Sequence, residues 1–386
     1  MQRGWETPFS LLKKVSNLFL MLDNSGMPRT FSELYLADAY PPMSYPSADP
    51  AVNAAVALAA GLDVADPAGA RILEIGCGTG HHILSLANRW PGAECTGVDI
   101  SAKGISKAKN LARQAGLANV KFCECPLQEF EPEGGFDFII APGFFSWVPD
   151  EVKLALMDFI GKRLSPGGIA VVSFNVVAGW RERMAVVEKV RAIQELGDTD
   201  EMTALSVMRD VAGESEAVIV DDMLAKGAEV LAFDDFAPVM DAWSLGAVVK
   251  LAEASGLKWL GDSVSGERGD DAGDDAEGRT FRAELFCGAD AVLGASLPVV
   301  SATPREAKIA DFPMLDAWRQ VCAREALPLP DAELKPCMFS FPQLKVLAAM
   351  DGSLSVVALA DHAKKVAPEL DFIPWLRHVA ERGLLV

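Results

Sequence analysis

The chain has 386 residues, 50% of them apolar, and this length indicates two or three folding units. Its net charge is −19, and residues 181–300 hold 25 acidic against 11 basic side chains, so no basic surface for nucleic acid is expected. No apolar run is long enough to span a bilayer, no secretory signal is evident, and the seven cysteines contain no Cys-x-x-Cys pair. These features predict a cytoplasmic protein with no membrane segment, metal centre or nucleic-acid partner.

Residues 1–50 are predicted to form an N-terminal helical arm followed by a lid loop. Apolar residues recur at helical spacing from Leu11 to Leu22. The proline-rich segment that follows contains Tyr40 and Tyr45. These two tyrosines either fold over a bound cofactor or belong to a proline-stiffened linker.

Residues 51–300 are predicted to form one domain, in which strands and helices alternate. Such alternation indicates a parallel sheet with helices on both faces. The predicted strands are 71–75, 94–99, 120–125, 136–141 and 169–174. The predicted helices are 50–62, 80–90, 101–115 and 150–164, the last of them ended by the sequence Ser165-Pro166-Gly167-Gly168.

The alternation of strands and helices stops after the fifth predicted strand. Residues 176–240 are acidic and predict a helical insertion, and a helix at 245–255 precedes a sixth strand at 257–260. A seventh strand at 280–287 is predicted to pair antiparallel with the sixth. The polar, glycine-rich run 266–278 between them predicts a mobile loop.

Residues 301–386 are predicted to be a separate C-terminal domain with a regulatory or interaction role. Its helical pattern is typical of a small winged-helix-like unit. The predicted helices are 306–325, 341–350, 353–366 and 371–383.

A glycine loop follows the first predicted strand. Gly76-Cys77-Gly78-Thr79-Gly80 turns the chain into a helix, whose first N–H groups favour an anionic group. The Gly-x-Gly-x-Gly spacing differs from the dinucleotide fingerprint. Asp99 ends the next strand, where an acidic side chain can bind both hydroxyls of a ribose. The combination predicts a nucleotide-like cofactor.

At these residues the sequence resembles the class I methyltransferases over about residues 68–290. The resemblance implies a Rossmann-like seven-stranded sheet, mostly parallel with the last strand antiparallel, and S-adenosylmethionine as the cofactor. It further implies that Glu74 binds the methionine end of the cofactor and that the turn 125–128 lies at the edge of its adenine ring. The predicted cofactor-binding residues are Tyr45, Glu74, Gly76, Cys77, Gly78, Gly80, Asp99, Ile100, Leu127, Gln128 and Pro142.

Several segments resemble more specifically the bacterial methyltransferases that carry a methyltransferase regulatory domain. These segments are Tyr45-Pro46-Ser47, 143–149, 173–180 and Thr280-Phe281-Arg282. Rickettsial members of that group methylate lysines of an outer-membrane protein. The chain departs from the pattern at Pro142, Ala178 and the triplet 233–235, near the presumed acceptor pocket.

The sequence contains fewer signals for the acceptor site than for the cofactor site. The turn Ala141-Pro142-Gly143-Phe144 offers no polar side chain, so no catalytic base is predicted. Aromatic residues are candidates for a wall around a cationic or amine acceptor, although plain core packing is the alternative for Phe144 and Phe145. The predicted substrate-binding residues are Tyr40, Phe145, Trp147 and Trp180.

Three functions remain open from the sequence. They are methylation of protein lysine, methylation of a small molecule, and cofactor binding by a regulator without catalysis. The sequence also leaves open whether the chain forms a homo-oligomer.

Overall fold

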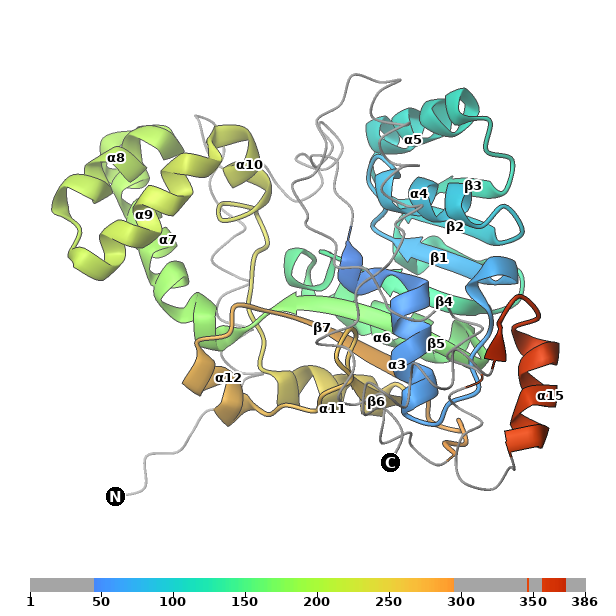
Figure 1. Cartoon of the computed structure of the whole chain (residues 1–386). Coiled ribbons are helices and arrows are strands. Elements are labelled where there is room, and N and C mark those ends of the chain that lie inside the picture. The colour runs from blue at the N-terminus through green and yellow to red at the C-terminus, as the bar shows by residue number, and fades with distance from the viewer. Residues whose placement is uncertain (1–44, 295–345, 347–355, 373–386) are drawn as a thin grey trace.

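A computed structural model describes residues 45–294, Val346 and residues 356–372 (Figure 1). Its centre is a seven-stranded sheet in the order β3-β2-β1-β4-β5-β7-β6. Strand β7 runs antiparallel to both of its neighbours, whereas the other paired strands are parallel, as predicted. The strands are β1 (Arg71–Ile75), β2 (Glu94–Asp99), β3 (Val120–Glu124), β4 (Phe136–Ala141), β5 (Leu164–Asn175), β6 (Leu257–Asp262) and β7 (Phe281–Gly288).

Apolar side chains from alternating strand positions enter two cores, one on each face of the sheet. Ile72 belongs to the core that also holds residues of α3 (Pro50–Ala59) and α4 (His81–Arg89). Leu73 belongs to the other core, with residues of α6 (Asp150–Arg163) and α11 (Leu245–Ala254). This alternation follows from the two-residue period of a strand. The parallel pairing of β1 to β5 places the carboxyl ends of these strands at one edge of the sheet.

Helix α5 (Ala102–Ala115) begins as the sequence predicts. Ser101 accepts a hydrogen bond from the backbone N–H of Gly104 at 3.1 Å, which is the contact expected of an N-cap serine. Gly116 ends the helix in the left-handed conformation. The helix therefore starts three residues after the last residue of β2 and returns the chain to β3.

The predicted insertion is helical. It contains α7 (Val177–Gly197), α8 (Glu201–Val211), α9 (Glu214–Lys226) and α10 (Ala228–Phe233), which gather at one end of the molecule (Figure 1). These helices share a core of their own, to which Val187, Leu205 and Val220 contribute. The insertion is thus a compact helical unit attached to the end of β5.

Two segments differ from the sequence prediction. Residues 165–168 were expected as a turn, but they lie within β5, which pairs with β4 from Leu164 onward. The register shifts between the pairs of Phe136 and Phe138, and Gly167 takes a φ of 76°. A glycine-permitted irregularity inside the strand therefore replaces the predicted turn.

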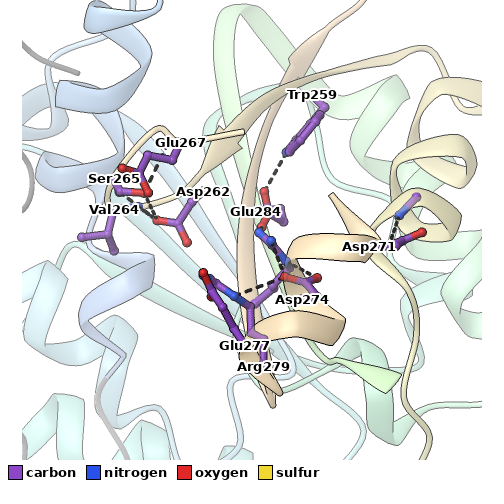
Figure 2. Close-up of polar contacts among 12 residues, drawn as sticks. Trp259, Asp262, Val264, Ser265, Glu267, Asp271, Asp274, Glu277, Arg279 and Glu284 are labelled. Atoms are coloured by element: carbon purple, nitrogen blue, oxygen red, sulfur yellow. Dashed lines mark hydrogen bonds and ion pairs between the residues drawn. The ribbon is translucent and has the colours of Figure 1, made fainter. Parts of the chain in front are cut away.

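The predicted mobile loop 266–278 contains a short helix, α12 (Asp271–Glu277). Asp270 caps it by accepting from the N–H of Gly273 at 2.7 Å. Buried Arg282 of β7 donates to both carboxylate oxygens of Asp274, at 2.8 and 2.6 Å, and to Glu284 at 2.7 Å. Glu284 also accepts from Trp259, and Figure 2 shows the resulting chain of contacts. Buried ion pairs with the strand that follows thus fix a segment whose composition alone suggests mobility.

Part of the prediction lies outside the described residues. This applies to the helical arm, to Tyr40 and to most of the C-terminal domain, so the domain boundaries remain predictions. In the C-terminal region α15 (Val356–Val366) is helical, within the predicted helix 353–366. Among the described helices, none is both long and apolar enough to cross a membrane.

Candidate functional site

A cavity of about 780 Å³ opens at the carboxyl ends of β1, β2, β4 and β5. Ligands of open α/β sheets bind at this edge, because the loops that follow the parallel strands converge there. Residues of the helical insertion and of β7 complete the wall. The cavity therefore collects segments that are far apart in the sequence.

The glycine loop forms one wall of the cavity. Gly76 and Gly78 line it with φ values of 72° and 52°, a conformation that favours glycine. Gly80 has a φ of 76° but does not line the cavity. A Cβ at this position would lie 2.8 Å from the Cβ of Ala108, so Gly80 serves the turn and the packing of α4 on α5. Cys77 lines the cavity as predicted.

Asp99 ties the loop to the end of β2. Its Oδ2 accepts from the N–H of Gly78 at 2.7 Å, and its Oδ1 accepts from the N–H of Ser101 at 2.8 Å. Burial raises the pKa of Asp99, while these backbone donors act in the opposite direction. Each oxygen keeps a further lone pair, so a ribose hydroxyl can be bound without releasing the loop. Ile100 lines the cavity beside it.

Glu74 is buried within β1 and also lines the cavity. Its Oε2 accepts from the N–H of Ile83 in the first turn of α4, at 2.9 Å. Burial raises the pKa of Glu74 well above its ordinary value. The carboxyl group of Glu74 thus links β1, which precedes the glycine loop, to α4, which follows it.

Tyr45 covers the cavity near the start of the described chain. Its N–H donates to Nδ1 of His82 at 3.3 Å, and its ring meets the ring of His82 edge-on with centroids 5.7 Å apart. The Nε2 atom of His82 lies 3.3 Å from the carbonyl oxygen of Ala48, which places the ring proton on Nε2. Burial lowers the pKa of His82 to about 4, so the imidazole is neutral. His82 was not among the predicted site residues, although the neighbouring pair His81-His82 was a signal in the sequence.

The predicted adenine turn also lines the cavity. Leu127 lies in the short 3-10 helix η3 (Leu127–Glu129), and Gln128 is beside it. Pro142, which follows β4, lines the cavity too. The cofactor assignments of these residues remain predictions, because the structure places them at the cavity without showing what they contact.

The remaining wall is aromatic and acidic. Trp147 and Trp180 line it, and their role in substrate binding stays a prediction. The aromatic lining also includes residues that were not predicted to bind substrate, namely Phe144, Phe233 and Phe281. Besides Glu74 and Asp99 at the glycine loop, the carboxylates that line the cavity are Glu151 and Asp234, and none of the described lining residues is lysine or arginine.

Phe145 does not line the cavity. Its side chain is fully buried and packs against Phe174 and Trp243, with ring centroids 6.2 and 5.3 Å away. The alternative of core packing therefore describes Phe145. Its neighbour Phe144 lines the cavity instead, because successive residues of this turn face different directions.

Comparisons with known proteins agree with this geometry. Residues 66–224 match a family model described as a methyltransferase domain. An uncharacterised protein of Rickettsia prowazekii (strain Madrid E) is 32% identical over 150 residues, which are 39% of this chain and 60% of that protein. A trans-aconitate 2-methyltransferase of Escherichia coli O1:K1 / APEC is 34% identical over 26% of this chain and 37% of its own length. The matched regions thus span less than two thirds of these relatives.

Among solved structures, PKMT2 from Rickettsia typhi in complex with AdoHcy superposes with a TM-score of 0.61. The match covers 88% of this chain and 74% of that one at 20% identity, so it shows a common fold. Residues 66–224 are therefore a methyltransferase domain of the S-adenosylmethionine-dependent, Rossmann-like class.

The cavity fits that cofactor. Gly76 and Gly78 let the backbone approach a ligand closely, and α4 begins beside the loop, where its N-terminus favours a carboxylate. Asp99 stands where a ribose is bound in such folds. These residues would hold the cofactor and leave the rest of the cavity for an acceptor.

Proposed function

We propose that this chain, which carries an S-adenosylmethionine-dependent methyltransferase domain, methylates an amine, with the lysine side chain of a protein as its acceptor. The observation that carries the proposal is the charge of the acceptor end. Glu151 and Asp234 line it together with several aromatic rings, and no described lining residue is lysine or arginine. Lys226, which is outside the lining, lies 2.5 Å from Oδ2 of Asp234 and offsets its charge, so the attraction falls mainly to Glu151. Such a wall attracts an ammonium group and stabilises it through cation–π contact.

The same wall opposes anionic acceptors. A carboxylate substrate, such as the one named for the trans-aconitate relative, would meet acidic groups without a compensating arginine or lysine in the described lining. Two negative charges repel each other more strongly where water is excluded than in bulk solvent. We therefore infer that the acceptor differs from that of the small-acid methyltransferases.

The proposed chemistry needs a neutral nitrogen. S-adenosylmethionine supplies a methyl group that is activated by the sulfonium charge, and the acceptor nitrogen must present a lone pair. The carboxylates Glu151 and Asp234 attract the lysine side chain in its ammonium form. The aromatic wall then displaces water from the nitrogen, and this desolvation favours loss of the ammonium proton. The lining residues thus capture, desolvate and align the amine.

A small-molecule amine is the second candidate, because a cavity of about 780 Å³ can hold both a cofactor and a small acceptor. The test is incubation of the protein with methyl-labelled S-adenosylmethionine and a bacterial lysate. Label in the protein fraction that is lost with Asp99→Ala supports the first candidate. Label confined to low-mass compounds supports the second, and no Asp99-dependent label in either fraction would sink both.

A further inference from the structure

A pair of free thiols lies at the end of β3. The Sγ atoms of Cys123 and Cys125 are 3.2 Å apart, and both side chains are half-buried. The two sulfurs meet because residues two apart in an extended chain point to the same face. The other cysteines of the described residues, Cys77, Cys95 and Cys287, are buried. The pair at β3 therefore combines contact between two thiols with access for a small reagent.

Cys125 connects this thiol pair to the cofactor site. It lines the cavity, as do Leu127 and Gln128 of the predicted adenine turn. Its backbone N–H donates to the carbonyl oxygen of Asp99 at 3.1 Å. A movement of Cys125 would therefore disturb both the turn expected at the adenine and the residue expected at the ribose.

The spacing of the two residues decides what a bond between their sulfurs would do. Residues two apart in a strand are separated by about 6.6 Å, close to the upper limit of about 6.8 Å for the Cα atoms joined by a disulfide. Closing the bond must therefore draw Cys125 toward Cys123, and a bond at this limit is easily reduced. β3 is an edge strand of the described sheet and pairs with β2 alone, so its end can shift without breaking any other strand pairing.

The surroundings of the two sulfurs set the order in which they react. Burial raises the pKa of Cys125 to about 12, and the neighbouring thiol of Cys123 acts in the same direction. Cys125 therefore keeps its proton and donates it to Sγ of Cys123. Such a hydrogen bond favours the thiolate of Cys123, the form of cysteine that attacks an oxidant.

We propose that Cys123 and Cys125 are a modification site, at which a peroxide forms a reversible disulfide that weakens cofactor binding. Sγ of Cys123 attacks one peroxide oxygen, the O–O bond breaks, and a sulfenic acid and one water result. Sγ of Cys125 then attacks the sulfenic sulfur, so that the S–S bond forms, the S–O bond breaks and a second water leaves. The two thiols lose two electrons and two protons, and the peroxide gains them. The proposal concerns the cofactor site and is independent of the methyl acceptor.

Calorimetry with S-adenosylhomocysteine tests the proposal on the full chain. The protein is treated with hydrogen peroxide, which catalase then removes. The Kd of the wild type should rise about tenfold, the effect of losing roughly one hydrogen bond, and dithiothreitol should restore it. Cys123→Ser should bind like the reduced wild type and should not respond to peroxide, because Cys125 alone stays protonated and has no sulfur to pair with. Cys287→Ala is the matched control, and it should respond to peroxide as the wild type does.

Peptide mapping shows whether the bond forms. Trypsin releases residues 122–153 as one peptide, which contains these two cysteines and no other. After peroxide treatment, this peptide should lack two hydrogen atoms and should resist alkylation until it is reduced. In a glutathione redox buffer, saturating S-adenosylhomocysteine should disfavour the disulfide by the same factor by which the disulfide weakens binding. Absence of the disulfide from this peptide, or a disulfide that leaves the Kd unchanged, would overturn the proposal.

Discussion

The Oδ2 atom of Asp99 lies 2.7 Å from the backbone nitrogen of Gly78. The side chain at the end of β2 therefore sets the shape of the glycine loop that follows β1. The same carboxylate also faces the cavity. One side chain thus shapes the cofactor loop and offers the acidic group expected at a ribose.

Removal of this carboxylate should weaken cofactor binding. Asp99→Ala is expected to lower the affinity for S-adenosylhomocysteine by about 1.5–3 kcal/mol, the range for hydrogen bonds to a charged group. Calorimetry measures this change. Glu124→Ala is the control, because Glu124 pairs in register with Asp99 but is exposed and does not line the cavity. An Asp99→Ala protein with wild-type affinity would show that the assignment is wrong.

The buried pairs of Arg282 should dominate the stability of the sheet edge near α12. Arg282→Ala removes the buried cation between Asp274 and Glu284. Asp274 keeps Arg279 at 3.2 Å and Glu284 keeps Trp259, so the free energy of unfolding should fall by about 3 kcal/mol, the lower end of the range for a broken buried pair. Urea denaturation followed by circular dichroism checks this. Arg181→Ala breaks an exposed pair with Asp275 and should cost at most about 1 kcal/mol. Similar losses in the two variants would contradict the structural role given to Arg282.

His82 should make stability depend on pH. Its pKa falls from an ordinary 6.5 to about 4 because the ring is buried, so the folded state favours the neutral form. The stabilisation is complete above pH 6.5 and is lost as the pH falls toward 4, by at most roughly 3 kcal/mol. The difference between the unfolding free energies of wild type and His82→Gln should therefore shrink in this window. A difference that is constant from pH 7.5 to 4.5 would refute the prediction.

Glu151 should assist the capture of a cationic acceptor. Glu151→Gln is expected to raise KM for a lysine-containing protein about two- to fivefold, consistent with roughly 0.5–1 kcal/mol for an exposed charge. High salt should reduce the difference between the two proteins. Asp158→Asn is the control on the same helix, because Asp158 is exposed and does not line the cavity. An unchanged KM at low salt would argue against an electrostatic role for Glu151.

The sequence predicted the sheet well because its signals are local. Strand and helix periodicity, the glycine loop and the serine cap of α5 each depend on residues close together in the chain. The helix α12 was missed because its stability comes from Asp274 meeting Arg282 of β7, a contact that composition does not reveal.

The acceptor site was even harder to predict, because it too depends on contacts between distant residues. Asp234 and Asn175 reach the cavity from segments nearly sixty residues apart, so no local motif joins them. The choice between Phe144 and Phe145 depended on the backbone of one turn, which the sequence does not specify. The unpartnered Nδ2 of Asn175 became visible only once the hydrogen bonds around it were known.

The most direct test of the central claim is the chemical identity of the methylated atom. Protein labelled from methyl-labelled S-adenosylmethionine should be hydrolysed completely, and its amino acids should be separated and analysed by mass spectrometry. An amine acceptor predicts that the label survives alkali and elutes with Nε-methylated lysine. Label that is released by mild alkali as methanol would identify a methyl ester, and that result would contradict the account.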